Sequence, residues 1–150
     1  MKKIMLGLFL ILGAMSFAAP KFVDMTKVKN AGYVIKNERE DILTMTTSDD
    51  DSAIIISFST INMSSKEISD LLKSNALRDS GNFIATLDNN RAYINEFEAQ
   101  GFYSYMIVPK KEKVKNQHTY ATYVSSKKLS KNDLSKITNA ILDEAESYIK

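Results

Sequence analysis

The chain has 150 residues, with 20 basic and 18 acidic side chains and a formal net charge of +2. It contains no cysteine, which excludes disulfide bonds, thiolate metal ligands and thiol nucleophiles. A nearly neutral chain has no long-range field that would attract a polyanion, so we expect no nucleic-acid partner.

The first residues, "MKKIMLGLFLILGAMSFAAP", have the order of a secretory signal peptide, with two lysines, an apolar run and then small residues before Pro20. We predict a signal peptide at residues 1–18 that is removed by cleavage after Ala18. The apolar run is shorter than the ~20 residues that span a bilayer, and an uncleaved anchor is the alternative. Lys2 and Lys3 account for the net charge of +2, so the mature chain is neutral. We expect it to be periplasmic or extracellular, with no transmembrane segment.

After the signal peptide we expect a flexible lead-in at residues 19–30 and a single α+β domain at residues 31–150. The domain begins with three predicted strands, "GYVIKN", "DILTMTT" and "AIIISFSTI". Apolar residues alternate in the third strand, which places Ile54, Ile56 and Phe58 on one face. The second and third strands are separated by a short polar segment and are therefore predicted to form a hairpin.

The segment between these strands, "TSDDDSA", contains three consecutive aspartates, Asp49, Asp50 and Asp51. Aspartates favour turns because their side chains accept hydrogen bonds from nearby backbone amides. Calcium loops of the EF-hand type alternate their acids and close with a distant glutamate, whereas these acids are contiguous. We predict a hairpin turn here, and a weak calcium site is the alternative.

Two helices are predicted, at about residues 64–77 and 131–149. Ser64 and Glu67 form a capping box at the first start, and Ser130 and Asp133 form a looser one at the second. Each helix has a one-sided apolar stripe, so each is expected to cover an apolar surface. The stripes are Ile68, Leu71, Leu72 and Leu77 in the first helix, and Leu134, Ile137, Ile141, Ala145 and Tyr148 in the second.

The region between the helices has four further β-rich runs, "NFIATLD", "RAYINEFEA", "FYSYMIV" and "HTYATYVSS". The links between them are of hairpin length, which implies antiparallel neighbours. We therefore predict an α+β fold, with an antiparallel sheet of about six to seven strands packed by the two helices.

This order of strands, capped helix, four-strand meander and C-terminal helix resembles the PsbP-like α/β sandwich, over about residues 30 to 150. The resemblance rests on element order and on no shared motif. It implies a small exported or peripheral protein that acts by binding another protein.

No set of residues predicts catalysis, a cofactor or a metal site. His118 is the only histidine, and it is expected to be a partly exposed strand residue. A triad would also need a presented nucleophile, and the chain has no G-x-S-x-G motif. Glu96 and Glu98 share one strand face about 7 Å apart, where a solvated pair is expected and a carboxylate-based hydrolase is the less favoured alternative.

Two features predict binding. Four lysines crowd one loop, and three tyrosines lie on two neighbouring strands, where aromatic side chains suit an interface. We therefore predict an exported, non-catalytic interaction protein of the bacterial envelope, whose partner is a protein or another envelope component. The alternative is a carrier of a small apolar or lipid-like ligand between helix and sheet. The predicted interaction residues are Tyr103, Tyr105, Tyr120, Lys110, Lys111, Lys113 and Lys115.

Overall fold

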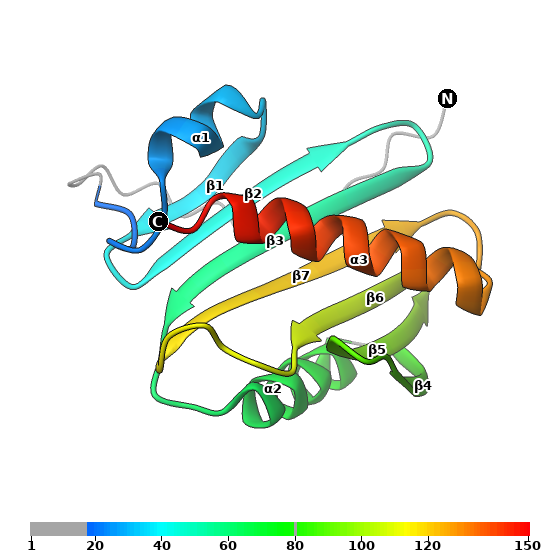
Figure 1. Cartoon of the computed structure of the whole chain (residues 1–150). Coiled ribbons are helices and arrows are strands. Elements are labelled where there is room, and N and C mark those ends of the chain that lie inside the picture. Colours follow the sequence, from blue (N-terminus) through cyan, green and yellow to red (C-terminus); the bar gives the residue numbers. More distant parts are fainter. Residues whose placement is uncertain (1–17, 80) are drawn as a thin grey trace.

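A computed structural model describes residues 18–79 and 81–150, and these form a seven-stranded antiparallel sheet with three helices (Figure 1). The predicted signal peptide lies outside the described residues except for Ala18. The strands are β1 (Val34–Arg39), β2 (Ile42–Ser48), β3 (Ser52–Thr60), β4 (Asn82–Asp88), β5 (Ala92–Ala99), β6 (Phe102–Pro109) and β7 (Gln117–Ser125). The helices are α1 (Met25–Asn30), α2 (Ser65–Arg78) and α3 (Lys131–Ser147). The predicted α+β class, strand number and antiparallel pairing are confirmed.

The sheet consists of two meanders that join at its centre. Its order is β1-β2-β3-β7-β6-β5-β4, so β3 pairs with β7, from Ser52 opposite Ser125 to Thr60 opposite Gln117. The helix α2 is the crossover that carries the chain from β3 to the far edge at β4. All the other strand links are hairpins.

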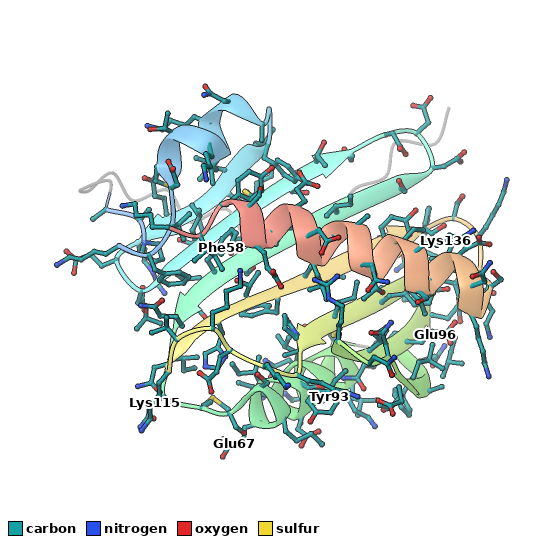
Figure 2. The ribbon with its side chains drawn as sticks, viewed as in Figure 1. Phe58, Glu67, Tyr93, Glu96, Lys115 and Lys136 are labelled. Atoms are coloured by element: carbon teal, nitrogen blue, oxygen red, sulfur yellow. The ribbon has the colours of Figure 1, made fainter. Side chains whose placement is uncertain are left out.

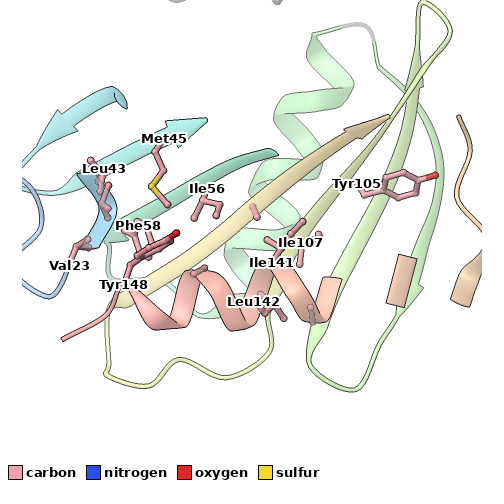
Figure 3. Packing of buried hydrophobic residues seen from close by; sticks show 14 of the residues in the cluster. Val23, Leu43, Met45, Ile56, Phe58, Tyr105, Ile107, Ile141, Leu142 and Tyr148 are labelled. Carbon is pink, nitrogen blue, oxygen red and sulfur yellow. The ribbon is translucent and has the colours of Figure 1, made fainter. Parts of the chain in front are cut away.

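The main core lies between the sheet and α3, which crosses the front face in Figure 1. Phe58 of β3 lies near the C-terminal end of α3 (Figure 2), and Figure 3 shows Ile141 and Leu142 of α3 close to Ile107 of β6. These side chains are at most 2% exposed. The apolar alternation of the strands and the predicted stripe of α3 therefore meet in one core.

The N-terminal segment differs from the expected flexible lead-in, because it packs into this core. Val23 and Val28 are 1% and 0% exposed, and the short helix α1 is capped by the Asp24 side chain. Backbone hydrogen bonds join this segment to the C-terminus, from Asp24 N–H to the Tyr148 carbonyl at 2.7 Å and from Lys150 N–H to the Phe22 carbonyl at 2.9 Å. Residues 19–30 thus complete the domain rather than precede it.

Both predicted helix starts are confirmed. Ser64 accepts a hydrogen bond from Glu67 N–H, and the Glu67 carboxylate accepts one from Ser64 N–H at 2.7 Å, as a capping box requires. These bonds to Ser64 hold the pKa of Glu67 below its usual value. Ser130 caps α3 in the same way through Asp133 N–H.

Candidate functional site

The two long helices lie on opposite faces of the sheet. Asn95 of β5 points away from α3, and its side-chain amide donates to Ser69 of α2, 3.0 Å from the hydroxyl and 3.3 Å from the carbonyl oxygen. Ile68 of α2 is 3% exposed on the same side. Since α2 packs on β5 and β6, it covers only one half of this second face.

The other half of the second face, on β1, β2, β3 and β7, has no helix over it within residues 18–79 and 81–150. Thr122 pairs with Met106, which in turn pairs with Asn95, so this row of residues shares the face that α2 contacts. The row continues through Ile55 to Thr46. A neighbouring row runs from Tyr120 through Ser57 to Thr44.

Three of the four strands in this bare half, β2, β3 and β7, carry no Asp, Glu, Lys or Arg, although 25% of the whole chain is charged. On the edge strand β1 this face carries Arg39, which pairs with Ile42. Three hydroxyl groups of this half form hydrogen bonds within the sheet. Thr44 and Ser57 share a hydrogen bond of 3.1 Å, and Thr46 donates to the Ile54 carbonyl at 3.0 Å. Burial raises the pKa of Tyr120, and the nearby hydroxyl groups of Ser59 and Ser57 oppose that rise. The surface is consequently less polar than its composition indicates.

The helix α2 borders this bare half and exposes two of the four residues in its predicted apolar stripe. Leu71 and Leu77 are 42% and 49% exposed, so the expectation that the whole stripe covers the sheet is wrong. One flank of α2 faces the edge strand β4, because Nζ of Lys73 lies 3.7 Å from the ring centre of Phe83 on that strand. At 3.6 residues per turn, Leu71 lies on the opposite flank, which faces the bare half. Leu77 comes four residues after Lys73 and therefore lies on the β4 flank with it. We call the bare half and the side of α2 that faces it the open surface; it comprises Thr44, Thr46, Ile55, Tyr120, Thr122, Glu67, Leu71, Ser74 and Arg78.

The structure separates the three tyrosines that the sequence grouped. Tyr120 lies on the open surface, whereas Tyr103 and Tyr105 point to the α3 side of the sheet. Tyr105 is 0% exposed, and its hydroxyl accepts a hydrogen bond from Leu129 N–H at 2.8 Å. Burial raises its pKa. Tyr105 is therefore a core residue that holds the loop before α3, and a partner has no access to it.

The lysine loop is partly neutralised by the protein itself. Lys110 pairs with Asp88 at 2.5 Å, and Lys113 pairs with Glu146 of α3 at 3.2 Å. Lys111 and Lys115 are exposed, and neither forms an ion pair among the described residues (Figure 2). Two free lysines give a weak field, so the loop is a less distinctive surface than the sequence indicated.

A small cavity of about 40 Å³ lies under this loop and is lined by His118, Glu112, Ser65 and other residues. His118 is 3% exposed, which corrects the expectation of a partly exposed residue, and its Nε2 lies 3.4 Å from a Glu112 carboxylate oxygen. Glu112 also accepts a hydrogen bond from Asn116 N–H at 2.8 Å. A space of this size holds a few water molecules and no larger ligand.

Glu96 and Glu98 do not form a solvated pair. Glu96 is 4% exposed, and one of its oxygens lies 3.7 Å from Lys128 Nζ. Glu98 accepts a hydrogen bond from Gly101 N–H at 3.1 Å in the turn between β5 and β6. The two carboxylates are thus engaged in local contacts, and neither lines one of the cavities described here.

The three aspartates lie in the predicted hairpin turn between β2 and β3. One Asp49 oxygen accepts hydrogen bonds from Asp51 N–H at 2.9 Å and from Ser52 N–H at 2.6 Å. These bonds hold the pKa of Asp49 below its usual value. The turn prediction is confirmed by this geometry.

Within the described residues, no group of three or more His, Asp or Glu side chains is arranged to hold a metal ion. None of the helices in this part of the chain is both long and apolar enough to cross a membrane.

Comparison with known proteins gives no match to a protein-family model, to a curated protein or to a solved structure. The open surface is therefore interpreted from its own geometry and chemistry.

Proposed function

We propose that this chain is an exported, non-catalytic interaction domain of the bacterial envelope, and that it binds a partner protein through the open surface. The observation that carries the proposal is the absence of charged residues on β2, β3 and β7, beside a helix that exposes Leu71 toward them. The cores of protein interfaces are depleted of charged residues in this way, and aromatic residues such as Tyr120 are enriched there.

The shape of the surface favours a protein over a small apolar ligand. Ligand pockets enclose roughly 300–1,000 Å³ and are mostly apolar. The cavity under the lysine loop measures about 40 Å³, and the space between α3 and the sheet is filled by the core. A larger depression of about 630 Å³ beside the N-terminal segment is open, and its lining includes Lys21, Asp24, Lys29, Glu38 and Lys150. Neither space suits the apolar carrier that the sequence left as the alternative.

Export is supported by the order of charged and apolar residues in residues 1–18. The resemblance to the PsbP-like layout also favours export, by analogy. The intact mass of the protein from its own host tests export, since cleavage after Ala18 removes a defined mass. A full-length mass in the cytoplasmic fraction would contradict it.

The binding surface is tested by a photo-crosslinking amino acid placed at Thr46 or at Thr47. These neighbours on β2 are the same residue type and point to opposite faces, with Thr46 on the open surface. Crosslinking in intact host cells should give a protein adduct from position 46 and none from position 47. Equal adducts from both positions, or none from either, would show that this face binds no protein.

A further inference from the structure

We infer that the partner at the open surface is a second copy of this chain, paired across a two-fold axis with the two α2 helices antiparallel. This inference rests on the proposed function and names its partner. The evidence is a stripe of four exposed residues on α2, at spacings of i, i+4, i+7 and i+11. The stripe consists of Glu67, Leu71, Ser74 and Arg78.

The order of residues in this stripe is self-complementary. An acid and a base lie at its ends, and a large apolar and a small residue lie between them. In an antiparallel pair centred between Leu71 and Ser74, Glu67 of each copy meets Arg78 of the other, and each leucine meets the other copy's serine. A two-fold interface requires this reciprocity, because if residue i contacts residue j, then j contacts i. Parallel pairing would instead place like charges together.

The bare half of the sheet gives the second helix a place to lie. Four strands at ~4.8 Å spacing make this half about 19 Å wide. With 14 residues at a rise of 1.5 Å, α2 is about 21 Å long and ~10 Å in diameter, so it fits there beside the first copy's own α2.

The result is a layer of two helices between two sheets. In this arrangement the outward side of α2, which includes Ser74, contacts the uncharged strands of the other copy.

The arrangement covers Leu71 and part of the strands that α2 leaves uncovered in the monomer.

The sheet edges are less suited to self-association. Edge strand β1 has an irregular register between Ile35 and Asn37, where Lys36 is exposed, and edge strand β4 has one between Phe83 and Ala85. Bulges and edge lysines prevent a further strand from pairing. Self-association through the sheet face is therefore more favourable than pairing through either edge strand.

The test measures the mass of the mature chain by sedimentation equilibrium, with charge reversals at the two ends of the stripe. The wild type should be a dimer. R78E and E67R should each dissociate at least tenfold more readily, and an equimolar mixture should recover a heterodimer in which both ion pairs are restored. The control K136E makes the same charge change as R78E at an exposed position on α3 and should stay dimeric.

Because E67R also removes part of the capping box, cysteine trapping provides a measurement independent of helix stability. The chain has no cysteine of its own, so L71C and S74C chains can be mixed and oxidised. A disulfide-linked heterodimer should form, and S74C mixed with K136C should give none. A monomeric wild type, a dimeric R78E, or a mixture that neither reassociates nor crosslinks would overturn the inference. If position 46 still crosslinks to a different protein in that case, the proposed function stands without the dimer.

Discussion

The leucines of the two long helices predict a sharp difference in stability that depends on the layer in which each one lies. Leu142 of α3 is 2% exposed in the main core, whereas Leu71 of α2 is 42% exposed on the open surface. Both residues are leucines on helices, so replacement by alanine makes the same chemical change and changes helix propensity little. Comparing the two substitutions isolates the contribution of burial.

The magnitude follows from the apolar groups removed. Leu142→Ala deletes buried methylene equivalents at ~0.8 kcal/mol each and leaves a cavity, so the free energy of unfolding should fall by about 2–5 kcal/mol. Leu71→Ala removes a side chain that water already reaches, so we expect a loss of about 1 kcal/mol or less. In a domain of this size, each kcal/mol corresponds to a shift of about 2–4 °C in Tm.

The assay is urea unfolding followed by far-UV circular dichroism, because the chain has no tryptophan to report by fluorescence. Measurements at low protein concentration keep association from adding to apparent stability. A concentration series then tests the dimer, since Leu71→Ala should weaken the dependence of Tm on concentration while Leu142→Ala retains it. Equal losses from both substitutions at low concentration would refute the placement of Leu71 at the surface.

Three further predictions concern the ends of elements. The hydroxyl of Tyr148 donates a hydrogen bond to Glu144 at 2.7 Å, and burial raises the pKa of Tyr148. Tyr148 therefore ionises in the unfolded chain at a lower pH than in the folded protein, and stability should fall as pH rises above about 10. Tyr148→Phe should make the decrease of Tm at high pH shallower, and an unchanged slope would contradict this. Ser64→Ala should lower the free energy of unfolding by about 1 kcal/mol through loss of the N-cap, whereas an exposed polar residue outside the open surface, such as Asn62, should tolerate alanine without loss. Val28→Asp should unfold the domain or lower Tm steeply because it places a charge in the core, and a small change measured by thermal melting would restore the flexible lead-in.

The elements that the sequence predicted correctly are those with local causes. The capping residues Ser64 and Ser130 act within one turn of helix, and the hairpin at Asp49 closes through its own side chain, so neighbouring residues suffice to identify them. The short helix α1 has only six residues, too few for a helical period to show, and its contacts come from the far C-terminus. The burial of Tyr105 depends on the loop at Leu129, which is distant in sequence. The burial of His118 depends on the loop that contains Glu112, whose path no local sequence pattern predicts.

The apolar stripe of α2 could not predict its own exposure, because a stripe reports an apolar direction and not the area of sheet available beneath it. Seven strands at ~4.8 Å spacing make a sheet about 34 Å wide, whereas one helix of ~10 Å diameter covers two or three strands. The first face receives both α3 and the N-terminal segment, and the second face receives α2 alone.

The position of α2 follows from the path of the chain. Since β3 and β4 are separated by β7, β6 and β5, and all neighbours are antiparallel, β3 and β4 run parallel and need a crossover connection. That crossover passes over the strands between them, which places α2 on the β4–β6 half and leaves the β1–β3 half without a helix. The topology therefore determines where the open surface lies, and the absence of charge on Thr46, Ile55 and Thr122 determines its chemistry. If this half of the sheet were simply exposed to solvent, lysine or glutamate would be tolerated at these three positions. Their uncharged side chains are therefore the evidence for a binding partner.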